Sequence, residues 1–169
     1  MKMSTFLKFI LKGNKVLEKS LTVRYLEVML VNSEFTIAVH SLVYLAYLPD
    51  HMASSQAIAQ NVATSPVRVR KIMSCLRDAG FVKTKEGTGG GYTLTAEPGD
   101  ITLGQVYRSV SYGAIKPTWC KGEREESCLI STNIQEVVNG IFTEADQYFA
   151  EYLDKTTIES VLNQIRQTR

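Results

Sequence analysis

The feature that most constrains the fold of this chain is a change of hydrophobic period at Gly80. On the N-terminal side of this glycine, the pattern predicts an α-helix from Ser65 to Ala79 with an apolar stripe along one face. On the C-terminal side, residues 81–85 and 92–95 alternate as β-strands do, and the glycine-rich segment 87–91 joins them. The change of period therefore predicts a helix that is followed directly by a hairpin. The apolar stripe of the helix consists of Val69, Ile72, Met73 and Leu76.

Two helices are predicted upstream of this unit. An opening helix follows the N-cap residues at 32–33, and Pro49 ends it. A second helix starts after Ser54 or Ser55 and runs through Val62. Only a short turn separates this second helix from the one that starts at Ser65. The order of elements is that of a winged helix-turn-helix, in which the hairpin is the wing.

Downstream of the hairpin, Thr102 can cap a short helix that runs through Val110. A long amphipathic helix is predicted from Asn133 to Leu153, and residues 158–165 form a last short helix. The predicted fold class is therefore mainly α with a small β-hairpin wing. It consists of a winged helix-turn-helix domain and a long C-terminal helix.

These patterns divide the chain into four segments. Residues 1–30 are a basic extension, which is either a native arm or upstream sequence translated from an earlier start codon. Residues 31–110 form the winged helix-turn-helix domain. Residues 111–131 are an irregular loop, and residues 132–169 hold the long helix and the C-terminal helix.

Charge is distributed unevenly over these segments. Between residues 64 and 92, six basic residues and two acidic ones give a charge of +4. Between residues 120 and 169, five basic residues and nine acidic ones give −4. A basic helix alone is often only a solvated face, but here a glycine-tipped hairpin follows it. In a helix-turn-helix the second helix lies in the major groove, so this arrangement predicts DNA binding.

Four sequence segments resemble the IscR/NsrR/CymR (Rrf-two) family of small bacterial transcriptional regulators. They are Asn-Ser-Glu-Phe-Thr-Ile-Ala-Val-His at 32–40, Leu-Arg-Asp-Ala-Gly-Phe-Val at 76–82, Gly-Gly-Gly-Tyr at 89–92 and Asp-Ile-Thr-Leu at 100–103. The resemblance covers roughly residues 32–153. It implies a repressor that binds double-stranded DNA at a palindromic operator as a homodimer. We expect the protein in the cytoplasm, and we expect its activity to respond to a thiol redox or small-molecule signal.

The resemblance also implies which residues contact DNA. The contacts of the recognition helix are Ser65, Pro66, Val67, Arg68, Arg70 and Lys71. Those of the wing are Lys85, Thr88, Gly89, Gly90, Gly91 and Tyr92.

The apolar stripe of the long helix is too long for a small domain to cover alone. Part of it is expected to pack within the protomer and the rest against a second copy, in an isologous two-fold contact. The predicted dimerisation residues are Ile134, Val138, Ile141, Phe142, Ala145, Phe149 and Tyr152.

The cysteine count bears on the signal. Relatives that hold an iron–sulfur cluster have three cysteines in the loop before the dimer helix, whereas this chain has only Cys120 and Cys128 there. A cluster normally takes four ligands, so no cofactor and no metal are expected. Two alternatives stay open: a thiol switch through Cys120 or Cys128, and two ordinary loop cysteines.

Other function classes have little support in the sequence. We find no nucleophile–base pairing and no cluster with metal-ligand spacing, so an enzyme is not expected. No apolar run reaches the length of a membrane span, and no signal peptide is apparent. The remaining alternative is a winged-helix module that binds other proteins and not DNA.

Overall fold

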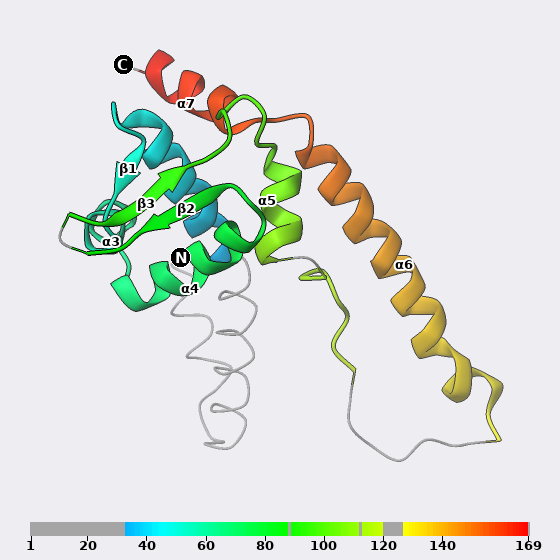
Figure 1. Cartoon of the computed structure of the whole chain (residues 1–169). Helices are drawn as coiled ribbons and strands as arrows, with labels where there is room; N and C mark the ends of the chain where they lie inside the picture. The colour runs from blue at the N-terminus through cyan, green and yellow to red at the C-terminus, as the bar shows by residue number, and fades with distance from the viewer. Residues whose placement is uncertain (1–32, 88, 112, 120–126, 169) are drawn as a thin grey trace, which may run out of the picture.

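The computed structural model describes residues 33–87, 89–111, 113–119 and 127–168. Its first helix covers residues 33–47 and is called the opening helix below. It is followed by β1 (Met52–Ala53), α3 (Ser55–Val62), α4 (Pro66–Asp78), β2 (Val82–Lys85), β3 (Gly91–Leu94), α5 (Leu103–Val110), α6 (Leu129–Leu153) and α7 (Ile158–Gln167) (Figure 1). The predicted extension 1–30, Thr88 and Cys120 lie outside the described residues.

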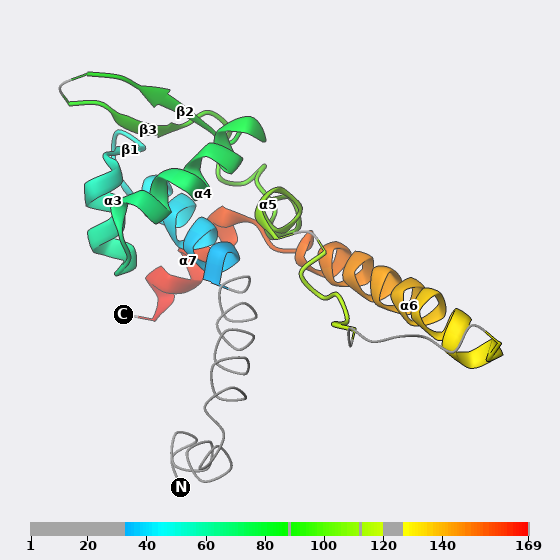
Figure 2. The same ribbon diagram turned by 90° about the horizontal axis from the view of Figure 1, so that it is seen from below.

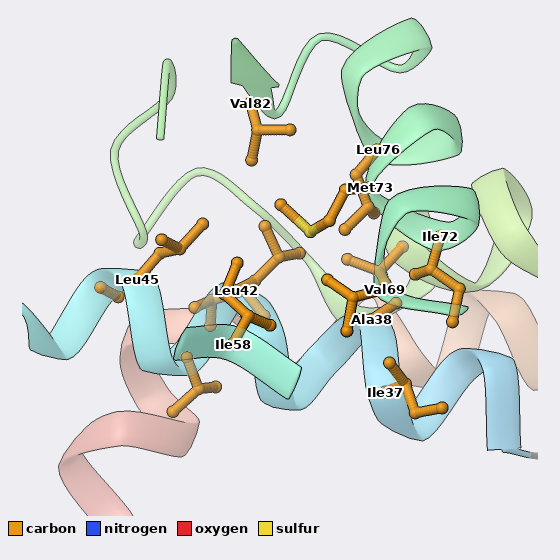
Figure 3. Close-up of a cluster of buried hydrophobic side chains, with 14 of the residues drawn as sticks. Ile37, Ala38, Leu42, Leu45, Ile58, Val69, Ile72, Met73, Leu76 and Val82 are labelled. Atoms are coloured by element: carbon orange, nitrogen blue, oxygen red, sulfur yellow. The ribbon is translucent and has the colours of Figure 1, made fainter. Parts of the chain in front are cut away.

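The core is built where the opening helix, α3 and α4 meet (Figure 3). Leu42 and Leu45 of the opening helix, Ile58 of α3 and Met73 of α4 have no exposed surface. Burial of one such side chain stabilises a fold by about 1.5–3 kcal/mol. The predicted stripe of α4 is fully part of this core, which fixes the orientation of the helix about its own axis.

Side-chain caps begin the helices where the sequence predicts them. Ser65 caps α4 by accepting a hydrogen bond from the Arg68 amide at 3.3 Å, and Pro66 occupies its first turn. Thr102 and Gln105 form a reciprocal capping box at α5. Gly80 has a φ of 83° just after α4, a left-handed conformation that ends the helix without steric cost.

The sheet has one strand more than the sequence predicts. Its order is β1-β3-β2, all antiparallel, with Met52 opposite Thr93 and Val82 opposite Leu94. The strand β1 has two residues and carries no alternation, so no period could reveal it. It ties the segment before α3 to the wing.

The C-terminal helices leave the body and return to it. α6 has 25 residues and begins at Leu129, four residues before the predicted start at Asn133. It projects away from the winged-helix body, whereas α7 lies back against it (Figure 2). Ile158 and Leu162 of α7 are buried in the main core. None of the described helices has the length and apolar character that crossing a membrane requires.

Candidate nucleic-acid interface

The helix α4 presents to solvent the face opposite its core residues. Val67 is 68% exposed, and Arg70 and Lys71 are exposed as well. Arg68 belongs to the same outer face in the sequence pattern, but it is half-buried and so less exposed than Arg70 and Lys71. The first two turns of α4 therefore carry three cations above a rigid core.

Each of these three cations contacts another helix. The Arg68 guanidinium donates a hydrogen bond to the Ser33 hydroxyl, at the start of the opening helix. Arg70 donates to the Ser55 hydroxyl of α3 at 3.4 Å. Lys71 forms an ion pair with Glu34, with 2.7 Å between Nζ and Oε1. The recognition helix is thus joined to both preceding helices through the side chains that the sequence assigns to DNA.

The ion pair with Glu34 affects the charge of Lys71. The hydrogen bond from Glu34, followed by its negative charge, raises the pKa of the Lys71 ammonium above its ordinary value. Lys71 therefore stays protonated, and 69% of its side chain faces solvent. A phosphate approaching α4 meets this ammonium and the neighbouring carboxylate together.

The wing places its two lysines on one face. Lys83 and Lys85 share one face of β2, and Val82 and Thr84 share the other, because side chains alternate along a strand. Val82 is buried, which sets Lys83 and Lys85 on the outer face. Tyr92 of β3 pairs with Thr84 and packs against the core, so its ring supports the wing from within.

The glycines of the wing tip have different roles. Gly87 and Gly89 adopt positive φ values of 90° and 76°. A glycine-rich tip favours positive φ throughout, but Gly90 does not adopt it, because its φ lies outside that region. Gly90 is required for another reason: a Cβ there would clash with the Lys85 carbonyl oxygen and lie 2.9 Å from that of Gly87. At Gly91, a Cβ would clash with the Ala53 carbonyl of β1.

The helix α6 has two different faces. Asp146 and Ala150, one turn apart, are buried and face α5, which packs against α6. Ile134, Ile141 and Tyr152 are exposed on the opposite side, and Ile141 retains 59% of its accessible surface. Among the other predicted dimerisation residues, Val138 and Phe142 are half-buried, Ala145 is exposed, and Phe149 is 39% exposed. Further exposed apolar residues, which the sequence analysis omitted from the set, are Leu129, Ile130, Val137 and Tyr148.

The described part of the loop before α6 packs along that helix. The Trp119 indole Nε1 donates a hydrogen bond to Asn139 Oδ1 at 2.9 Å. Cys128 occupies the N-cap position of α6 and is a free, half-buried thiol. Cys75 lies on α4, in the winged-helix body. The described residues contain no group of three or more histidine, cysteine, aspartate or glutamate side chains that could hold a metal ion.

Sequence reasoning missed a polar junction between α5 and α6. Asp146 accepts hydrogen bonds from the Tyr107 hydroxyl and, at 2.9 Å, from the Gly113 amide. The Tyr107 ring packs edge-on against Phe35 at 5.7 Å and Phe149 at 5.2 Å. A signal was present, because Asp146 lies one turn after Phe142 and one turn before Ala150, so an acid occupies a position of the apolar pattern of α6.

Known proteins are similar to this chain in sequence and in fold. The HTH-type protein YwnA of Bacillus subtilis (strain 168) is 28% identical over 137 residues, which cover 80% of this chain and 99% of YwnA. The HTH-type transcriptional regulator CymR of the same organism is 33% identical over 109 residues, or 64% of this chain and 70% of CymR. A crystal structure of a Lactobacillus plantarum protein matches with a TM-score of 0.66 and 29% identity, over 79% of this chain and 89% of that one.

The family assignment rests on a longer match. The model of the Rrf2 family, described as "Iron-dependent Transcriptional regulator", matches residues 31–164. This range contains the helix-turn-helix, the wing, α6 and most of α7. The match confirms the resemblance and the winged-helix fold that the sequence predicts. The chain belongs to the Rrf2 family of DNA-binding transcriptional regulators.

Proposed function

We propose that this regulator is a homodimeric repressor whose two α4 helices read the half-sites of a palindromic operator. The observation that carries the proposal is the arrangement of α4: its inner face is locked in the core, while Val67, Arg70 and Lys71 face solvent. Two such helices related by a two-fold axis would enter successive major grooves about one helical turn apart.

The proposed contacts divide between bases and phosphates. Arg70 is an exposed guanidinium near the N-terminus of α4, and guanidinium groups pair bidentately with guanine. Lys71, Lys83 and Lys85 are suited to phosphates, which provide most of the affinity of DNA-binding proteins. Ser65, Pro66, Val67 and Arg68 on the helix, and the segment from Thr88 to Tyr92 on the wing, complete the proposed surface.

We assign the dimer contact to the outer face of α6. This face carries apolar side chains along almost the whole helix, and monomeric proteins rarely expose so large a continuous apolar surface. An isologous contact between two copies would cover it. The proposed contact residues are Ile134, Val138, Ile141, Phe142, Ala145, Phe149 and Tyr152.

The family description names iron, but the donor set of this chain does not fit an iron–sulfur cluster. The loop offers two cysteines, Cys120 and Cys128, and Cys75 lies on the recognition helix. We propose a regulator without a cluster, whose signal is either a thiol change at Cys120 or Cys128 or the binding of a small molecule. Protein purified without oxygen should then be colourless, and a visible absorption band with stoichiometric iron would refute this.

A shift assay with duplex DNA at low salt tests the proposed function against a module that binds only proteins. The parent protein should retard the duplex, and the retardation should weaken steeply as salt increases. If Cys120 or Cys128 carries the signal, peroxide should change the affinity, and Cys120→Ser or Cys128→Ser should remove that change. We propose no catalytic activity and a cytoplasmic location, where a bacterial operator lies.

A further inference from the structure

We propose that Glu34 is a specificity-determining residue of DNA binding. Its carboxylate holds the Lys71 ammonium, so a DNA phosphate has to compete with it before Lys71 becomes a full contact. Random DNA is bound through phosphates alone, so its affinity depends on Lys71 leaving Glu34, whereas base contacts hold the operator even while the ion pair persists. The pair therefore lowers the affinity for random DNA more than the affinity for the operator. The inference rests on the proposed placement of α4 at the DNA.

The two partners of the ion pair differ in their exposure to solvent. The Glu34 side chain keeps 26% of its accessible surface, whereas the Lys71 side chain keeps 69%. The distance of 2.7 Å between Oε1 and Nζ is that of a charge-assisted hydrogen bond. The ammonium therefore lies on the solvent side of the pair, where a phosphate would arrive, and the carboxylate lies behind it.

The neighbours of Glu34 anchor this part of the opening helix. On one side, the Ser33 hydroxyl accepts a hydrogen bond from Arg68, one turn before Lys71 on α4. On the other side, the Phe35 ring packs edge-on against Tyr107, and Ile37 is buried in the core. The backbone of Glu34 is therefore held in place, and its side chain is shorter than the four-carbon stem of Lys71, which can swing further toward DNA.

The pair changes what a phosphate encounters at α4. Glu34 cancels the charge of Lys71 at a distance, so the long-range attraction of this site for a polyanion is weak. Because an exposed ion pair contributes little to folding, removal of the Glu34 charge should leave the fold intact. Substitution of Glu34 is therefore a clean test of its role in DNA binding.

The same helix supplies a matched control. Asp78 pairs with Arg77 at 3.0 Å at the C-terminal end of α4, and both side chains are at least half exposed. Asp78→Asn removes one negative charge from one ion pair, as Glu34→Gln does, but at the end of α4 away from the proposed contacts. The change in net charge is identical in the two variants.

The experiment uses two fluorescent duplexes, one selected from random DNA by the parent protein and one with the selected sequence scrambled. Binding is titrated at several salt concentrations. Glu34→Gln should bind the scrambled duplex roughly three- to tenfold more tightly at low salt, with a salt dependence steeper by about one unit. The ratio of selected to scrambled affinity should fall. Asp78→Asn should stay within about twofold of the parent on both duplexes.

The Lys71→Ala background separates the two claims. There, Glu34→Gln should tighten binding to both duplexes by the same factor, because it only removes an unpaired carboxylate that repels phosphates, and the ratio of selected to scrambled affinity should not change. If Lys71→Ala weakens binding but Glu34→Gln acts like the parent, or weakens both duplexes, the role of Glu34 is overturned and the placement of α4 stands. If Lys71→Ala binds both duplexes like the parent, the placement of Lys71 at the DNA fails, and the role of Glu34 fails with it.

Discussion

The Tyr107 hydroxyl donates a hydrogen bond to the Asp146 carboxylate inside the contact between α5 and α6. Asp146 is only 3% exposed, and its second oxygen accepts a hydrogen bond from the Gly113 amide at 2.9 Å. One buried acid thus joins α5, the loop that follows it, and α6. The contact sets the direction in which α6 leaves the winged-helix body.

Loss of this acid should destabilise the protein. Asp146→Ala leaves the Tyr107 hydroxyl and the Gly113 amide without their acceptor, which costs about 1–3 kcal/mol for a buried donor. Tyr107→Phe should cost less, since the Gly113 amide keeps its partner. Urea denaturation at a fixed protein concentration measures both, with the exposed Glu144→Ala as a control expected within about 0.5 kcal/mol of the parent. An Asp146→Ala protein as stable as the parent would show that the junction is not structural.

A second acid, Asp154, gives stability a dependence on pH. Hydrogen bonds from Arg108 lower the pKa of the Asp154 carboxyl below its ordinary value, and a hydrogen bond from the Thr102 hydroxyl at 2.7 Å adds to the effect. Because the folded pKa is the lower one, the stabilisation is complete above the unfolded pKa of about 3.9. It is lost as the pH falls from that value through the folded pKa.

Comparison of the parent with Asp154→Asn isolates this contribution. The difference between their free energies of unfolding should be constant from pH 7 down to about pH 4 and should shrink below it. Chemical denaturation at a series of pH values measures the difference. A difference that grows as the pH falls would mean that the sign of the pKa shift is wrong.

The proposed dimer predicts that a charge on the outer face of α6 separates the protomers. Ile141→Asp places a carboxylate where a second copy would bury it without a partner, so the variant should be monomeric at micromolar concentration. Gln147→Asp puts the same carboxylate on an exposed position of α6 off the apolar face, and this variant should remain dimeric. Light scattering decides between the two states. A parent protein that is monomeric in this measurement rules out the proposed dimer.

Much of the winged-helix body could be predicted from the sequence because its elements carry strong local patterns. The stripe of α4, the cap at Ser65 and the left-handed Gly80 each leave a signal within a few neighbouring residues. The exposed face of α6 follows in the same way from its periodicity. The packing of the other face of α6 could not be predicted in this way, since the Asp146 junction depends on α5.

The contacts that link separate elements could not be predicted. Ser33 with Arg68, and Glu34 with Lys71, join residues 35 and 37 positions apart, and no periodicity relates them. The strand β1 is too short to alternate. Gly90 looks like a glycine chosen for positive φ, whereas its requirement comes from the carbonyl oxygens that fold back over it.

The central claim is that the outer face of α4 reads DNA, and one titration tests it most directly. Binding of the selected and scrambled duplexes is measured against salt for the parent, Arg68→Ala, Arg70→Ala, Lys71→Ala and, as control, Arg77→Ala at the far end of α4. Arg70→Ala should lower the preference for the selected duplex by about 1–3 kcal/mol, and Arg68→Ala should lower it too. Lys71→Ala should weaken binding to both duplexes and flatten the salt dependence by about one unit. Arg77→Ala should bind like the parent. If Arg68→Ala, Arg70→Ala and Lys71→Ala all bind both duplexes as the parent does, α4 does not contact DNA with this face.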